Sequence, residues 1–125
     1  MIEIQAAERL AALGHPARLQ VMRLLMAAGV DGVAAGELAR AAGLAASAAT
    51  FHLDRLRLAG LARRRRLGRE IRYSARFEEM RELVDFLTDT CCTHAEGEGR
   101  CQPICAAGTA GPGARSDSQA EQETP

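Results

Sequence analysis

The fold is decided by residues 43–73, whose sequence is GLAASAATFHLDRLRLAGLARRRRLGREIRY. Apolar residues in its first half recur at helical spacing, which predicts an inward helix face made of Ala49, Leu53, Leu56 and Ala59. In its second half, Leu61 to Leu67 and Arg69 to Ser74 flank Gly68, and this pattern predicts a two-stranded hairpin. A short helix followed directly by a cationic hairpin is typical of small domains that read duplex DNA.

Three further helices are predicted before this one. The first carries Ile4, Ala7, Leu10 and Ala11 at helical spacing and ends near Gly14. The second opens at His15-Pro16, because proline suits a first helical turn, and it stops at Gly29. Its buried face is predicted to contain Leu19, Val21, Met22, Leu24, Leu25 and Met26.

The third helix, Gly36 to Ala42, is followed by Gly43, which supplies the left-handed residue that turns the chain into the fourth. Two short helices about a glycine turn make a helix-turn-helix. The outward face of the fourth helix carries Ser47, Thr50, Phe51 and Arg55. Small hydroxylated side chains suit entry into the major groove, because bulk would hold the helix away from the base edges.

Two alternatives accompany this interpretation. The outward face could be an ordinary solvated surface, and the cationic hairpin that follows is what favours DNA contact. His52 could reach a phosphate, or it could pack in neutral form against the preceding helix.

Charge is distributed unevenly along a chain whose formal net charge is zero. Residues 61–76 hold seven arginines and one acid, a balance of +6, whereas residues 88–125 hold six acids and two arginines, a balance of −4. The arginines expected to bind phosphates near the hairpin tip are Arg64, Arg65, Arg66 and Arg69. The alternative of a merely solubilising hairpin is disfavoured, because the like charges repel one another and need an anion.

Composition and the last apolar segment predict the fold class. The chain has 125 residues, 47% hydrophobic and 3% aromatic, which suits one helix-rich domain. Phe77 to Cys92 again follows the helical period and predicts a last helix. The predicted fold is a mainly α winged helix-turn-helix with a small β-hairpin wing.

A homodimer is also expected. Because a small domain has a high surface-to-volume ratio, we expect the first and last helices to pair with their copies in a second chain. Such a dimer suits pseudo-palindromic double-stranded operator DNA.

No targeting or membrane segment is predicted. Charged residues interrupt the N-terminus, and the longest apolar run, Leu24 to Val30, is too short to cross a bilayer. We therefore expect a cytoplasmic protein with no membrane partner. In that reducing compartment, four cysteines are expected to be free thiols, metal ligands or redox sensors rather than structural disulfides.

Four segments resemble the ArsR/SmtB family of metal-sensing repressors. They are LGHPARLQVMRLL (residues 13–25), GELARAAGL (36–44), SAATFHLDRLRLAGL (47–61) and GREIRYSA (68–75). The resemblance implies a homodimeric winged-helix repressor that occupies its operator in the apo form and leaves it when a metal or metalloid binds. No enzymatic activity is expected, because a cysteine oxidoreductase would need a C-x-x-C motif, which the sequence lacks.

All cysteines lie in CCTHAEGEGRCQPIC, as Cys91, Cys92, Cys101 and Cys105. Thiolates are soft ligands, and a vicinal pair with a third cysteine on a glycine-containing loop can form the three-coordinate centre that trivalent arsenic prefers. The spacing is also similar to the C-terminal arsenite site of one branch of the family, in which an adjacent pair ends the last helix. We expect no permanently bound cofactor and an effector that is arsenite, As(III), with Sb(III) or methylarsenite as further options. Either Cys101 or Cys105 would be the third ligand.

Two other effector classes stay open. A divalent metal such as zinc or cadmium could use His94 or Cys105 beside the other cysteines, although a vicinal pair suits a closed tetrahedron poorly. A thiol-redox switch is the second, since nearby Arg100 could lower the pKa of a thiol.

Four positions depart from the family pattern. Other arsenic sensors of the family carry Cys-Val-Cys where this chain has Ala34 and Gly36, and the zinc sensors carry histidine where it has Leu87. Ala45 stands where a polar residue usually starts the recognition helix, and alanine cannot cap it.

The predicted organisation has three parts. Residues 1–92 form the DNA-binding and dimerisation domain, and residues 93–105 form a cysteine-containing effector-binding segment. Residues 106–125 are rich in Gly, Ser and acids and are expected to be disordered.

Overall fold

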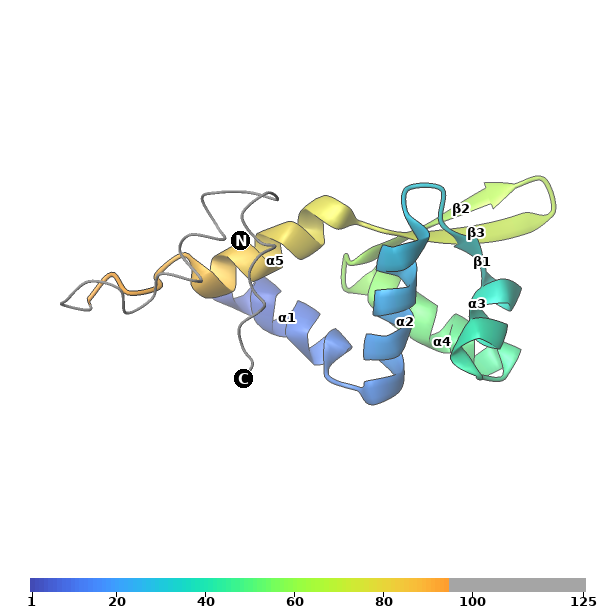
Figure 1. Ribbon diagram of the computed structural model, residues 1–125, viewed down its shortest axis with the longest axis horizontal. Helices are drawn as coiled ribbons and strands as arrows, with labels where there is room; N and C mark the ends of the chain where they lie inside the picture. The colour runs from blue at the N-terminus through green and yellow to red at the C-terminus, as the bar shows by residue number, and fades with distance from the viewer. Residues whose placement is uncertain (95–125) are drawn as a thin grey trace, which may run out of the picture. The chain divides into compact units, whose positions relative to one another are not determined.

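The structure is a computed structural model that describes residues 1–94. Within this part of the chain the elements are, in order, α1 (Glu3–Leu13), α2 (Pro16–Ala28), β1 (Val33–Ala34), α3 (Ala35–Ala42), α4 (Ala46–Leu58), β2 (Ala62–Leu67), β3 (Glu70–Ala75) and α5 (Phe77–Thr88) (Figure 1). Met1–Leu83 form one compact unit, and a second unit begins at Val84. The predicted mainly helical architecture with a small hairpin is confirmed.

The hydrophobic core of the first unit lies where α2, α3 and α4 pack against one another and against β3. Leu25, Leu53 and Leu56 have no solvent exposure, and Met22 and Leu38 have 1%. Burying such a side chain stabilises the fold by roughly 1.5–3 kcal/mol. On α4 the predicted inward stripe is confirmed, apart from Ala59, which is only half-buried because it caps the end of the helix.

Helix α2 begins and ends where the sequence predicts. The Nδ1 atom of His15 accepts a hydrogen bond from the Ala17 backbone N–H at 3.1 Å, and Pro16 occupies the first turn. Gly29 follows the last residue with a φ of 81°. The predicted buried face was too broad, because Leu19 and Met26 are 47% and 37% exposed on the single chain.

The helix-turn-helix consists of α3, a glycine turn and α4. Gly43 has the predicted left-handed conformation, with a φ of 70°, and its N–H reaches the carbonyls that end α3. Ala45 lies at the N-terminal cap of α4 and makes no side-chain hydrogen bond there, as its methyl group dictates. The motif therefore depends on packing against α2 rather than on a capping side chain.

The hairpin belongs to a three-stranded antiparallel sheet in the order β1-β3-β2, so the prediction of only two strands was incomplete. Strand β1 pairs Val33 with Tyr73 and Ala34 with Arg72. Leu67 and Glu70 face each other across the two-residue loop Gly68-Arg69, and Gly68 has the positive φ, 63°, that tight hairpins favour. In Figure 1, β2 and β3 project beyond the helices as a long wing.

Gly32 is required where the loop before β1 meets the wing. Its φ is 75°, and a Cβ added there would clash with the backbone carbonyl of Tyr73. The Arg72 guanidinium fastens the same loop, because its Nη2 donates to the Gly32 carbonyl at 2.9 Å and its Nε donates to the Asp31 carbonyl at 3.2 Å. The base of the wing is thus held by a close backbone approach that only glycine allows and by the hydrogen bonds of the Arg72 side chain.

Helix α1 is tied to the end of α4 by Arg9. The Nε of Arg9 donates to the Ala59 carbonyl at 3.2 Å, and its Nη2 lies 3.1 Å from Oε1 of Glu79. The apolar residues predicted for α1 do not face this contact, since Ile4 and Leu10 are 68% and 41% exposed. The single chain therefore leaves an apolar surface on α1 uncovered.

Helix α5 ends at Thr88, four residues before the predicted end at Cys92. The Thr88 hydroxyl donates to the carbonyls of Val84 and Asp85 at 3.1 and 3.3 Å, a local bond that competes with further helix. The run Thr88-Asp89-Thr90 also has low helix propensity. Among residues 1–94, no helix is long and apolar enough to span a bilayer.

Candidate functional site

The outward face of α4 has the character predicted from the sequence. Ser47, Thr50, Phe51 and Arg55 are all exposed, whereas Ala49, Leu53 and Leu56 on the opposite side are fully buried. This division gives α4 a polar, sterically open face with one large apolar ring in it. Contact of this face with DNA stays a prediction.

His52 lies behind that face. Its side chain is 9% exposed, and its ring packs against the His15 ring with the two centroids 5.0 Å apart. Burial lowers the pKa of His52 below the ordinary value of 6.5, and the charges of His15 and Arg18 lower it further. The buried position favours the packing alternative over a phosphate contact.

Phe51 connects the buried histidine to the exposed surface. Its ring meets the His52 ring edge-on, with the centroids 5.7 Å apart and an interplanar angle of 65°. The Cζ atom of Arg55 lies 5.8 Å from the centroid of the Phe51 ring, within reach of a cation–π interaction. Phe51 is 56% exposed despite these two contacts.

The wing has cationic side chains on both of its faces. Cross-strand partners share a face of a sheet, and Arg64 and Arg66 pair with Tyr73 and Ile71. Arg63 and Arg65 pair with Ser74 and Arg72 and so take the opposite face. All four arginines of β2 are exposed, as is Arg69 at the tip. A strand with cations on both faces can straddle a sugar–phosphate backbone.

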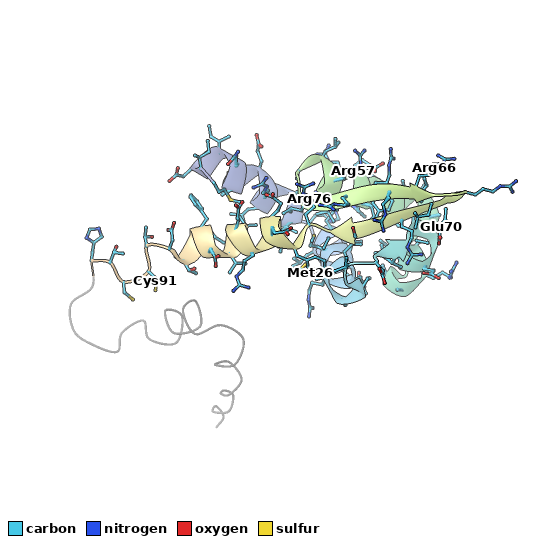
Figure 2. The ribbon with its side chains drawn as sticks, turned by 90° about the horizontal axis from the view of Figure 1, so that it is seen from above. Met26, Arg57, Arg66, Glu70, Arg76 and Cys91 are labelled. Carbon is cyan, nitrogen blue, oxygen red and sulfur yellow. The ribbon has the colours of Figure 1, made fainter. Side chains whose placement is uncertain are left out.

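Two of the seven arginines counted in the sequence have structural roles instead. Besides its contacts with the 31–32 loop, Arg72 forms an ion pair with Glu70 at 3.1 Å. Arg76 lies 3.7 Å from Oε2 of Glu79. Figure 2 shows Arg66 and Glu70 toward the end of the hairpin and Arg76 where the hairpin meets the helices. The exposed charge of the wing therefore lies along β2 and at the tip.

Asp54 links the wing to α4, and sequence reasoning missed it. Its Oδ1 accepts a hydrogen bond from the Tyr73 hydroxyl at 2.9 Å and lies 3.3 Å from Nε of Arg57. Burial raises the pKa of Tyr73 above 10.0, and the hydrogen bond to Asp54 raises it further. The signal was present in the sequence, because a buried tyrosine needs a partner for its hydroxyl.

The vicinal cysteines lie in the turns that follow α5, near the C-terminal limit of the described chain. The two sulfurs of Cys91 and Cys92 are 3.4 Å apart, and both side chains are half-buried. Cys92 has a φ of 63°, a left-handed conformation that is uncommon for a residue with a side chain. Its sulfur is disulfide-bonded in the structure.

The other predicted ligands, Cys101 and Cys105, lie outside the described residues, as do the boundaries predicted at 105 and 106. Within residues 1–94, no group of three His, Cys, Asp or Glu side chains is arranged to hold a metal ion. The geometry therefore brings together two of the four predicted ligands, and the assignment of all four stays a prediction.

Residues 13–65 match a family described as a helix-turn-helix domain. The HTH-type transcriptional regulator YgaV of Escherichia coli is 41% identical to the chain over 88 residues, which cover 70% of the chain and 87% of YgaV. This match is long enough to establish common family membership.

Two solved structures share both fold and sequence with the chain. An ArsR-like transcriptional regulator from Rhodococcus sp. RHA1 is 28% identical with a TM-score of 0.59, and the match covers 69% of the chain and 78% of the regulator. The homodimeric winged helix-turn-helix DNA-binding domain of a possible ArsR-family regulator from Mycobacterium bovis is 30% identical with a TM-score of 0.56, and the match covers 76% of the chain and 88% of that domain. The chain therefore belongs to the ArsR family of winged helix-turn-helix transcriptional regulators, which are DNA-binding proteins and not enzymes.

Proposed function

We propose that the protein is a cytoplasmic, homodimeric repressor that releases its operator when trivalent arsenic binds its C-terminal cysteines. In the reduced protein, in which the disulfide of Cys92 is opened, the thiolates of Cys91 and Cys92 would supply two ligands, and Cys101 or Cys105 the third. The observation that carries this proposal is the 3.4 Å separation of the Cys91 and Cys92 sulfurs just beyond the last helix. Two soft donors at that distance can bind one soft ion together.

The proposed contact with operator DNA uses two elements. The exposed side chains of α4 would enter the major groove, where base edges carry the sequence information. The exposed arginines of the wing would neutralise phosphates and release counterions. Tyr73 and Asp54 support this arrangement, because their hydrogen bond fixes the wing to the reading helix.

The proposed dimer would use the first and last helices. Ile4 and Leu10 of α1 are exposed, and so, within the second unit, are Val84 and Leu87 of α5 at 52% and 54%. Exposed apolar side chains of this size are expected to be covered by a partner. The relative from Mycobacterium bovis is homodimeric, and a twofold dimer would present two copies of α4 to a pseudo-palindromic site.

Coordination number favours a metalloid over a divalent metal. A tetrahedral zinc site needs four ligands, whereas trivalent arsenic needs three. The described residues offer the vicinal pair and no third neighbouring ligand. Residues 95–125 would therefore have to supply one ligand for arsenite and two for zinc or cadmium.

Release would follow from linkage between the two sites. If the metalloid binds the DNA-free dimer more tightly than the DNA-bound dimer, it lowers operator affinity by the coupling free energy, typically about 1–3 kcal/mol. This coupling corresponds to a roughly 5- to 150-fold increase in Kd for operator DNA. Antimonite and methylarsenite share the thiol chemistry, and methylarsenite needs only two thiolates.

The test is fluorescence anisotropy of the fully reduced protein on labelled promoter DNA, titrated with arsenite. We expect release from wild type and from His94→Ser, a control that removes an exposed neighbour, but not from Cys91→Ser or Cys92→Ser. Comparison of Cys101→Ser with Cys105→Ser identifies the third ligand. Release by arsenite from a variant lacking all four cysteines would refute the proposed site.

Thiol oxidation is a second candidate, favoured by the disulfide-bonded state of Cys92. Oxidation of two thiols to a disulfide releases two protons and two electrons, which an oxidant such as hydrogen peroxide would accept to form water. In the same assay, release by peroxide together with indifference to arsenite would assign a redox sensor. Release by zinc or cadmium alone would instead assign a divalent metal.

A further inference from the structure

Phe51 is the one large apolar side chain on the exposed face of α4 formed by Ser47, Thr50, Phe51 and Arg55. Its ring is 56% exposed, although its contact with His52 shows that it lies against the protein on one side. The major groove offers one apolar group for such a ring, the C5 methyl of thymine. If this face bound only phosphates, hydroxyl and guanidinium groups would be enough and an exposed apolar ring would not be needed.

The Phe51 ring is held in place from within the protein. Its edge contact with His52 is backed by the His52–His15 ring contact, at 5.0 Å between centroids, and His52 is almost fully buried. Contact with a base therefore costs less conformational entropy than it would for a freely rotating ring. A residue held this way is suited to specific contact.

Arg55 is positioned by the same ring. It follows Phe51 by one helical turn, with its Cζ 5.8 Å from the ring centroid. A stacked guanidinium keeps its planar fork of donors available, and this fork matches O6 and N7 of guanine. Side chains four residues apart on a helix are about 5–6 Å apart at Cβ, and base pairs are stacked about 3.4 Å apart. The two side chains can therefore reach base pairs one or two steps apart.

We infer that Phe51 and Arg55 form a specificity-determining pair, in which Phe51 contacts a thymine methyl group and Arg55 reads a guanine one or two base pairs away. This inference rests on the proposed entry of α4 into the major groove. His52 is a positioning residue in it, because it holds the Phe51 ring and does not touch the base. The predicted half-site therefore contains a thymine and a guanine close together.

The first test removes the thymine methyl group alone. The preferred site is selected in vitro with the full-length reduced protein, and each thymine is then replaced by deoxyuridine, one at a time. For one thymine per half-site we expect about a fourfold increase in Kd, the equivalent of one methyl group returned to water. Phe51→Ala should bind the methylated and unmethylated sites equally, and Phe51→Leu should retain part of the difference.

The second test removes the guanine N7. Replacement of the paired guanine by 7-deazaguanine should raise the Kd of wild type by about fivefold or more, since a bidentate contact discriminates by roughly that factor at its lower limit. Arg55→Met should bind both sites with similar affinity, because a thioether has no hydrogen-bond donor to offer the guanine. Phe51→Ala should also weaken the guanine preference, since it removes the ring beneath Arg55.

Leu58→Ala is the matched control, because Leu58 is a 72% exposed apolar residue at the far end of the same helix. It should preserve both preferences. The inference is overturned if no thymine shows a methyl effect, if the effect persists in Phe51→Ala, or if Phe51→Ala weakens every sequence equally. If the wild-type protein selects no DNA sequence, both the inference and the proposed function fail. If it selects a sequence but shows no dependence on a thymine methyl group, the assignment of Phe51 fails and the proposed function stands.

Discussion

At the scale of single residues, periodicity predicts which side chains of α4 face the core but not what the remaining ones do. The exposed set of Ser47, Thr50, Phe51 and Arg55 follows from the 3.6-residue repeat. His52 lies at the border of that set, where period alone allows either direction. Its contact with His15 joins α4 to the residue that caps α2, far away in the sequence, so the sequence could only leave the alternatives open.

The pKa of His52 predicts a loss of stability in mild acid. The unfolded chain takes up this proton near the ordinary pKa of 6.5, before the folded chain does, because burial lowers the folded-state pKa. The free energy of unfolding therefore falls as the pH drops through 6.5, and the loss caused by His52 is complete once the pH is below the lowered pKa. At pH values well above 6.5, His52 is neutral in both states and causes no loss of stability.

Urea denaturation at about pH 7.5 and about pH 5.5 measures this contribution. His52→Gln cannot titrate, so we expect a smaller difference between its two midpoints than wild type shows. His94→Gln, which changes an exposed ring, should keep the wild-type difference. An unchanged difference in His52→Gln would show that another group causes the acid sensitivity.

At the scale of elements, the helices and the β2-β3 hairpin could be predicted because each carries its own local pattern. Strand β1 could not, since it has only two residues and exists through its pairing with β3. The end of α5 was predicted too late for a different reason. The apolar period continues to Cys91, but Thr88, Asp89 and Thr90 have low helix propensity, and the helix ends at Thr88.

The link between the wing and α4 predicts a moderate effect of Tyr73→Phe. The change removes the 2.9 Å hydrogen bond to Asp54 and leaves the buried ring in place. We expect the free energy of unfolding to fall by about 1.5–3 kcal/mol, the range for a hydrogen bond to a charged group. Chemical denaturation measures it, and Arg57→Ala, which breaks a partly exposed ion pair, should cost less. Equal or reversed costs would contradict the linking role of Tyr73.

Gly32 predicts a larger effect at the base of the wing. In Gly32→Ala the new Cβ would meet the Tyr73 carbonyl, in addition to the strain of a positive φ. Gly29→Ala has a similar φ, 81°, but open space around the new atom, so it isolates the strain alone. We expect Gly29→Ala to cost roughly 1–3 kcal/mol, because its φ and ψ lie in a region that essentially only glycine adopts, and Gly32→Ala to cost more, as measured by thermal unfolding. Similar melting temperatures for the two variants would show that the loop moves to relieve the clash.

At the scale of the whole molecule, zero net charge conceals a cationic wing whose arginines on β2 and at the tip are exposed, whereas Arg72 and Arg76 hold the fold. Charge counting found the wing but could not tell Arg72 and Arg76 from the others, because their partners lie elsewhere in the chain or on the next helix. The cysteine site was predicted from ligand chemistry. The structure adds the proximity of Cys91 and Cys92, and the third ligand lies outside the described residues.

The charge of the wing predicts how strongly DNA binding depends on salt. Each phosphate contact contributes roughly −0.9 to the slope of log K against log salt concentration. Arg65→Ala should reduce the magnitude of that slope by about one for each wing that contacts DNA, without changing the preferred sequence. Arg23→Ala, which removes an exposed arginine from α2, should leave the slope unchanged. If Arg65→Ala shows the same slope of log K against log salt concentration as wild type, Arg65 does not contact a phosphate.

Coupling between the cysteines and the DNA-reading surface is tested most directly by the affinity of the reduced protein for arsenite, measured by calorimetry with and without saturating operator DNA. Linkage requires that operator DNA weaken arsenite binding by the same factor by which arsenite weakens operator binding. We predict a decrease of roughly 5- to 150-fold in arsenite affinity when the operator is bound, and no measurable binding to Cys91→Ser. Equal arsenite affinity in the presence and absence of the operator would contradict the proposed mechanism.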